Sequence, residues 1–125
     1  MGERRVLVVD DDEDMILFLT GLLRKAGYTV LTAYDAAEAV IQAQRERLDL
    51  IVLDILMPEG GGFAVLDRLM TSAQTRTTPV IVLTGSDEPA VEAWARAAGV
   101  TRFLRKPCDG ATLVDAVRVA LGESG

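Results

Sequence analysis

The chain has 125 residues, a formal net charge of −6, no histidine and one cysteine, Cys108. The negative charge argues against nucleic-acid binding through a basic face, and a single cysteine excludes an internal disulfide. The absence of histidine excludes histidine-based acid–base catalysis and nearly all ordinary zinc sites, so any chemistry depends on carboxylates, Lys, Ser, Thr and backbone groups.

The first predicted strand, residues 6–9, is a continuous apolar run that is followed at once by five acids, residues 10–14. Two like charges about 4 Å apart repel by roughly 4 kcal/mol at an effective dielectric constant near 20, so a partner must offset the charge of Asp10 and Asp11. We expect the last three acids of the run to begin the first helix, where the helix dipole favours negative charge. Apolar residues at helical spacing follow, and Gly27 provides a stop signal.

Four more predicted strands alternate with helical patterns along the rest of the chain: residues 29–34, 50–53, 80–83 and 101–104. Asp35 and Asp109 have the position of N-caps for the second and fifth helices, and Ser86 is expected to cap the fourth. Gly99 then ends that fourth helix.

This alternation predicts a parallel sheet with right-handed crossovers and helices on both faces. The segments 6–9, 50–53 and 80–83 are apolar throughout, as is typical of central strands covered on both sides. The two less apolar strands then form the edges. We therefore expect an α/β, flavodoxin-like doubly wound (βα)5 domain with strand order 2-1-3-4-5, whose ligands bind at the carboxyl ends of the strands.

Polar residues stand where these strands end: Asp10, Asp11, Asp54, Thr84 and Lys106. The predicted topology brings them into one crevice, where Mg²⁺ would offset the repulsion between three carboxylates. Asp54 is central and has the position of a nucleophile that forms an aspartyl phosphate. Lys106 and the metal would neutralise charge on a transferring phosphoryl group, and Thr84 would donate its hydroxyl to it.

Four short motifs carry a resemblance to a known family: VVDDD, LDILMP, LTG and RFLRKP. In this order and at this spacing they resemble the receiver domains of two-component response regulators, over residues 4–122. Each motif alone is weak, whereas the four together are specific.

The resemblance implies that Asp54 accepts a phosphoryl group from a phosphohistidine on a sensor histidine kinase or phosphotransfer protein. It implies that Asp11, Asp54 and the backbone carbonyl of Leu56 bind Mg²⁺ directly, that Asp10 holds the metal through water, and that Mn²⁺ could substitute. Lys106 would contact the phosphoryl group. The lack of histidine fits this assignment, because the donor imidazole belongs to another protein.

The resemblance also implies a switch formed by Thr84 and Phe103; the alternative for Phe103 is an aromatic residue that only packs in the core. Pro107 is expected to follow a cis peptide bond that directs the preceding lysine. Phosphorylation would alter the face made by the fourth helix, fifth strand and fifth helix, and with it the affinity for a downstream effector.

Some positions depart from the family pattern. Residues 60–62 are three glycines where the family often has Met-Asp-Gly, so we expect a more mobile loop there. Arg102 stands where the family often has Asp. Leu56 and Ser86 stand at positions where members of the family tune dephosphorylation. We expect no side-chain help there in positioning water, and hence no unusually short phosphorylated lifetime.

Two other functions compete with this interpretation. A phosphatase with an aspartyl-phosphate intermediate needs a second Asp two residues after the nucleophile, where Leu56 stands. A flavin carrier needs a phosphate-cradling loop after the first strand, where acids stand, and a receiver that only docks should have lost one of the five site residues.

We expect residues 1–125 to form a single receiver domain without an effector domain, and not an enzyme beyond its own phosphorylation and dephosphorylation. No apolar run approaches the ~20 residues of a membrane span, and the N-terminus lacks the apolar segment of a signal peptide, so a cytoplasmic location is expected. Whether the receiver acts alone or as part of a longer regulator or hybrid kinase stays open.

Overall fold

A computed structural model of the chain describes residues 3–123 and contains one five-stranded sheet. Its strands are β1 (Arg5–Val9), β2 (Thr29–Ala33), β3 (Leu50–Leu53), β4 (Val80–Thr84) and β5 (Arg102–Arg105). All neighbouring strands pair in parallel, in the order β2-β1-β3-β4-β5. The predicted doubly wound topology is confirmed.

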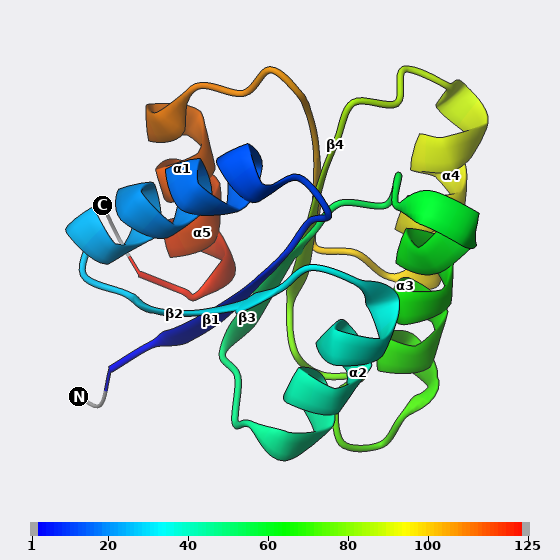
Figure 1. Cartoon of the computed structure of the whole chain (residues 1–125), viewed down its shortest axis with the longest axis horizontal. Helices are drawn as coiled ribbons and strands as arrows, with labels where there is room; N and C mark the ends of the chain where they lie inside the picture. Colours follow the sequence, from blue (N-terminus) through cyan, green and yellow to red (C-terminus); the bar gives the residue numbers. More distant parts are fainter. Residues whose placement is uncertain (1–2, 124–125) are drawn as a thin grey trace.

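Helices cover both faces of the sheet, as Figure 1 shows. Their bounds are α1 (Glu13–Lys25), α2 (Ala36–Arg45), the 3-10 turn η1 (Pro58–Gly60), α3 (Gly61–Thr71), α4 (Pro89–Ala98) and α5 (Gly110–Ala120). Helices α1 and α5 lie on one face, and α2, α3 and α4 lie on the other.

The sheet separates two hydrophobic cores. Val6 and Val8 of β1 belong to the core beneath α1 and α5, whereas Leu7 and Val9 belong to the core beneath α2, α3 and α4. Successive side chains of a strand point to opposite faces, so a strand buried on both sides must be apolar at every position. This is the physical reason for the continuous apolar runs in the sequence.

Three helix starts agree with the sequence prediction. Asp12 is the N-cap of α1 and accepts a hydrogen bond from the backbone N–H of Asp14, so the acids after the first two do begin this helix. Asp35 and Asp109 cap α2 and α5 in the same way, through the N–H groups of residues 38 and 112. Carboxylates at these positions satisfy backbone donors that have no partner within the helix.

The predicted cap of α4 is wrong. This helix begins at Pro89 with Glu88 as its N-cap, and Ser86 lies in the loop before it. Proline favours the first helical position, because its missing N–H would be unpaired there anyway and its φ is already helical. The Ser86 hydroxyl instead accepts a hydrogen bond from the backbone N–H of Glu88 at 3.3 Å.

The prediction that residues 60–62 form a loop is wrong for Gly61 and Gly62, which are buried in the first turn of α3. A Cβ atom on Gly62 would lie 2.1 Å from the carbonyl oxygen of Ile55, so this glycine permits a close approach of two backbone segments. Gly60 and Glu59 precede it in the left-handed region, with φ of 68° and 60°.

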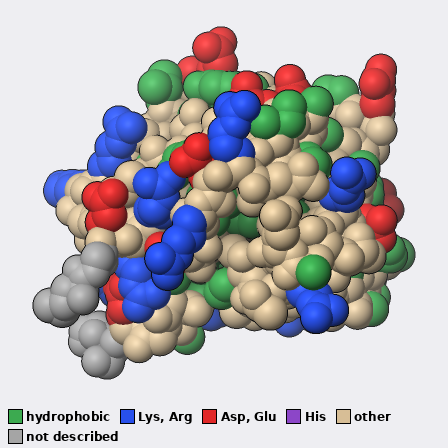
Figure 2. Space-filling model, turned by 90° about the horizontal axis from the view of Figure 1, so that it is seen from below, with side chains coloured by type: hydrophobic (Ala, Val, Ile, Leu, Met, Phe, Trp, Pro, Cys, Tyr) green, Lys and Arg blue, Asp and Glu red, His purple; other side chains and the backbone are tan. Residues whose placement is uncertain are grey.

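The surface carries charges of both signs. On the face seen in Figure 2, Lys and Arg side chains are interspersed with Asp and Glu. Two ion pairs illustrate this mixture, Arg5–Glu46 at 2.6 Å and Arg4–Glu123 at 3.5 Å. Within residues 3–123, every helix is too short or too polar to cross a bilayer.

Candidate functional site

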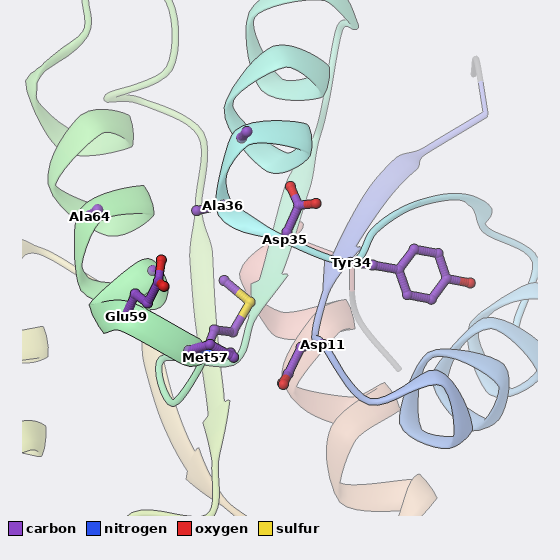
Figure 3. A pocket seen from close by; sticks show the side chains of 10 residues that line it. Asp11, Tyr34, Asp35, Ala36, Met57, Glu59 and Ala64 are labelled. Carbon is purple, nitrogen blue, oxygen red and sulfur yellow. The ribbon is translucent and has the colours of Figure 1, made fainter.

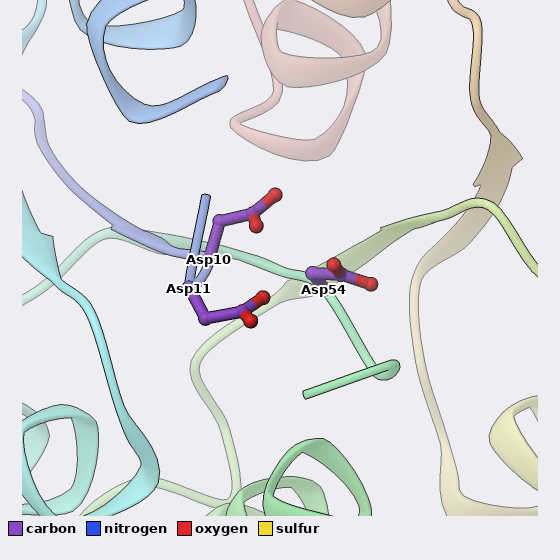
Figure 4. Close-up of side chains that lie close together, drawn as sticks. All are labelled: Asp10, Asp11 and Asp54. Atoms are coloured by element: carbon purple, nitrogen blue, oxygen red, sulfur yellow. The ribbon is translucent and has the colours of Figure 1, made fainter. Parts of the chain in front are cut away.

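Three carboxylates meet where β1 and β3 end. Val9 pairs with Leu53 in the sheet, and the backbone N–H of Asp54 donates a hydrogen bond to the Val9 carbonyl at 2.9 Å. Asp10 and Asp11 therefore emerge beside Asp54, as Figure 4 shows. Each of the three offers a carboxylate oxygen, and these oxygens lie within 4.8 Å of one another. The cluster expected from the sequence is present, and it could hold a metal ion.

The three acids differ in burial and in hydrogen bonding. The exposed fractions of Asp10 and Asp54 are 1% and 5%, whereas Asp11 is exposed. Asp10 Oδ1 accepts from the backbone N–H of Asp12 at 3.0 Å, and Asp54 Oδ1 accepts from that of Leu56 at 3.0 Å. One oxygen of each buried carboxylate is thus fixed by the backbone, and the other is left for the crevice.

Lys106 supplies one positive charge, which the two buried acids share. Its Nζ donates to Asp10 Oδ2 at 2.7 Å and to Asp54 Oδ2 at 3.2 Å. The lysine lies directly after β5, where its backbone N–H donates to the Thr84 carbonyl at 2.8 Å. The Lys106–Pro107 peptide bond is cis, as predicted.

This arrangement shifts the pKa values of both partners. Burial raises the pKa of Asp54 above its ordinary value; the Leu56 N–H and the Lys106 charge oppose this shift, and the neighbouring Asp10 adds to it. Burial alone would lower the pKa of Lys106, but the hydrogen bond to Asp10 and the charges of Asp54 and Asp10 outweigh it and raise that pKa. Lys106 is therefore charged at neutral pH.

The two predicted switch residues lie on neighbouring strands. Thr84 ends β4 fully buried, and its Oγ1 accepts from the Ser86 N–H at 3.4 Å. Phe103 lies on β5, where it pairs with Val82, and it is buried in the core beneath α2, α3 and α4. Its burial agrees with core packing, the other interpretation of this residue, and the switch role stays a prediction.

Leu56 and Ser86 stand at the two positions expected to affect dephosphorylation, and their effect on it stays a prediction. Leu56 is 48% exposed, two residues after Asp54, and its side chain has no polar atom to offer the carboxylate cluster. The Ser86 hydroxyl accepts from the Glu88 N–H within its own loop.

A hollow of about 420 Å³ opens beside Asp11. It lies between the segments that follow β1, β2 and β3, and Figure 3 shows Met57 and Glu59 on one side, with Asp35 and Asp11 on the other. This hollow cannot be predicted from the sequence, because its lining comes from separate segments that no motif joins.

Arg105 is the residue near the site that sequence reasoning missed. Its guanidinium donates to the Ser86 carbonyl at 2.6 Å and to Glu92 at 2.8 Å. The sequence could have pointed to Arg105 only as a charged residue next to Lys106 in a short edge strand. The contacts of Arg105 depend on the path of the loop between β4 and α4.

The family model described as the response regulator receiver domain matches residues 6–118. The chain belongs to this family. Receiver domains of two-component response regulators are phosphorylation-dependent signalling switches, which receive phosphoryl groups from histidine kinases.

Relatives of this receiver domain differ in length. It is 34% identical to the protein PilH of Pseudomonas aeruginosa over 94% of the chain and 97% of PilH. It is 37% identical to the response regulator PleD of Caulobacter vibrioides over 91% of the chain, which is only 25% of PleD. Similar receivers thus occur both as nearly whole proteins and as parts of longer ones.

Solved structures agree with the fold. The chemotaxis protein CheY4 of Vibrio cholerae superposes with a TM-score of 0.89 at 33% identity, covering 96% of this receiver and 100% of CheY4. The receiver domain of the sensor histidine kinase PA1611 of Pseudomonas aeruginosa, solved with a magnesium ion in its active site cleft, gives 0.88 at 26% identity, covering 98% and 100%.

Proposed function

We propose that Asp54 is the phosphoacceptor of this receiver domain and that Asp10, Asp11, Thr84 and Lys106 assist the transfer. The observation that carries the proposal is the position of Asp54, a buried carboxylate at the end of the central strand β3, with a lysine ammonium 3.2 Å from its Oδ2. Neither a helix cap nor a surface role explains a carboxylate held there beside two others.

The chemistry is the transfer of one phosphoryl group. A carboxylate oxygen of Asp54 forms a bond to phosphorus while the bond from phosphorus to the donor nitrogen breaks, and the leaving imidazole takes up a proton. Lys106 stabilises the negative charge of the phosphoryl oxygens, because its ammonium already lies against Asp54. The buried hydroxyl of Thr84 donates to one of those oxygens.

We assign Mg²⁺ to the carboxylate cluster. Asp11, Asp54 and the Leu56 carbonyl would hold it directly and Asp10 through water, and Mn²⁺ would substitute. Bonds of 2.0–2.1 Å place two ligand atoms of one Mg²⁺ about 3 to 4 Å apart, which fits oxygens that lie within 4.8 Å of one another. When bound, the cation neutralises charge on the transferring phosphoryl group.

The partners follow from this chemistry. The donor is a sensor histidine kinase or a phosphotransfer protein, and residues 1–125 act as one receiver domain, in the cytoplasm. Phosphorylation moves Thr84 and Phe103 and changes the face made by α4, β5 and α5, which binds a downstream effector. Apart from its own phosphorylation and dephosphorylation, the domain catalyses no reaction.

Intact-mass spectrometry tests the acceptor. Incubation with acetyl phosphate and Mg²⁺ should add one phosphoryl group to the wild type and to Asp67→Asn, which changes an exposed acid on α3. Asp54→Asn should gain none. An equal gain in Asp54→Asn would refute the assignment, and steady hydrolysis of phosphomonoesters would favour a phosphatase instead.

Thermal unfolding tests the metal site. A ligand that binds only the folded state at 100 times its Kd stabilises it by about 2.7 kcal/mol, so Mg²⁺ should raise the Tm. Asp11→Asn should reduce this shift, because it removes a ligand without removing either partner of Lys106. An unchanged shift in Asp11→Asn would exclude Asp11 as a ligand.

A further inference from the structure

The guanidinium of Arg105 joins three segments of the chain. Its Nη1 donates to the Ser86 carbonyl at 2.6 Å, in the loop between β4 and α4. Its Nη2 donates to Glu92 Oε1 of α4 at 2.8 Å. Its Cζ lies 5.5 Å from the centre of the Phe103 ring, a distance typical of a cation–π contact.

These contacts reach both residues assigned to the switch. The Ser86 N–H donates to Thr84 Oγ1, so the residue whose carbonyl Arg105 holds is itself bound to the threonine of the site. The same guanidinium lies over Phe103. A continuous series of hydrogen bonds therefore runs from Thr84 through Ser86 and Arg105 to Glu92 on α4.

We propose that Arg105 is a positioning residue that holds the loop after β4 in its unphosphorylated arrangement and so sets how readily the receiver switches. The inference rests on the proposed function. An aspartyl phosphate at Asp54 attracts the Thr84 hydroxyl, and Thr84 draws Ser86 with it through their hydrogen bond. This movement separates the Ser86 carbonyl from the guanidinium.

Contacts that exist in only one of two states shift the equilibrium toward that state. The Arg105 contacts favour the unphosphorylated arrangement, and their loss makes the phosphorylated arrangement easier to reach. A hydrogen bond from a charged donor to a carbonyl is stronger than one between neutral groups. The bond from Arg105 to the Ser86 carbonyl can therefore shift the equilibrium between the two arrangements measurably.

The ion pair with Glu92 alone would be a weak basis for this role, because exposed ion pairs contribute little. Hydrogen bonds from Arg96 and Arg105 lower the pKa of Glu92, which keeps it charged as their common anchor. Arg96 donates to Glu92 Oε2 at 2.8 Å through its Nε. No hydrogen bond joins Arg96 to the Ser86 carbonyl within residues 3–123, so Arg96 is a matched control with the same charge and the same carboxylate partner.

The experiment compares Arg105→Gln with Arg96→Gln. Beryllofluoride, a phosphoryl mimic that is not transferred, is titrated in the presence of Mg²⁺. Trp94, the single tryptophan, reports from α4 by its fluorescence, and the amide resonance of Ser86 reports from the loop. Arg105→Gln should bind beryllofluoride about three- to tenfold more tightly than the wild type and react faster with acetyl phosphate, whereas Arg96→Gln should match the wild type.

A merely structural role for Arg105 would lower the Tm without tightening beryllofluoride binding, and that result would overturn the inference. Equal effects of the two substitutions would overturn it as well, because the Ser86 contact would then be irrelevant. If Arg105→Gln fails to fold, Glu92→Gln removes the anchor of the guanidinium and should shift the affinity in the same direction; an unchanged affinity would refute the role. A wild type that neither binds beryllofluoride nor accepts a phosphoryl group would instead refute the proposed function.

Discussion

Gly62→Ala should destabilise the protein, whereas Gly21→Ala should stabilise it. In Gly62→Ala, the new methyl carbon would lie 2.1 Å from the carbonyl oxygen of Ile55 and 2.4 Å from its carbonyl carbon and Cα. These are buried backbone atoms, so the clash can be relieved only by moving α3 or the segment after Asp54. Overpacking costs typically about 1–3 kcal/mol and more where backbone must shift, so we expect a loss of about 3 kcal/mol or more.

Gly21→Ala is the matched control. Gly21 lies inside α1, and no atom outside its own helix turn lies within 4 Å of a Cβ added there. Alanine has the better helix propensity, so this variant should gain about 0.5–1 kcal/mol.

Urea unfolding followed by Trp94 fluorescence and circular dichroism measures both changes in the free energy of unfolding. Gly62→Ala should also react more slowly with acetyl phosphate, because Ile55 lies next to Asp54 in the chain and is displaced by the methyl group. Substitutions at the surface usually change the free energy of unfolding by less than about 0.5 kcal/mol. A Gly62→Ala protein whose stability differs from the wild type by no more than this, and whose reactivity is unchanged, would refute the reasoning.

Three other changes have defined outcomes. Lys106→Met leaves Asp10 and Asp54 without their cation, so in metal-free buffer its free energy of unfolding should fall by about 3 kcal/mol. Mg²⁺ should then raise the Tm of the variant by more than it raises the Tm of the wild type, and equal shifts would contradict this. Thr20→Val should gain about 1 kcal/mol in urea unfolding, because Thr20 Oγ1 is buried without a hydrogen-bond partner among the described residues, and a loss would count against it. Leu56→Asn should speed loss of the phosphoryl group about tenfold by intact-mass time course, the effect of about 1.4 kcal/mol from one new hydrogen bond to water; an unchanged half-life would exclude such help.

The sheet and its order could be predicted because parallel strands covered on both faces have a distinctive composition. Residues 6–9, 50–53 and 80–83 are apolar at every position, and the strands that contain them, β1, β3 and β4, are central in the structure. Asp35 and Asp109 were recognisable as caps because a short carboxylate before a helical pattern has one dominant use. The prediction of Ser86 as the N-cap of α4 was wrong because Pro89, three residues later, has a stronger preference for the start of a helix.

The sequence could predict which residues come together in the site, but not the contacts between their side chains. Parallel topology brings the strand ends together, so Asp10, Asp54 and Lys106 were expected in one crevice. That Lys106 reaches both carboxylates depends on side-chain paths that no spacing encodes. The role of Gly62 and the contacts of Arg105 were hidden for a similar reason, because each involves a backbone carbonyl brought close by a distant segment.

The separation of the two cores has a consequence for how the domain can change over evolution. Side chains beneath α1 and α5 and those beneath α2, α3 and α4 lie on opposite faces of the sheet, so the costs of substitutions in the two groups should add independently. Residues at the carboxyl ends of the strands form a rim that borders both cores, and there the costs of substitutions should no longer add independently. Either layer can therefore be remodelled for a new partner while the other is preserved, and only the few residues of the rim are constrained from both sides.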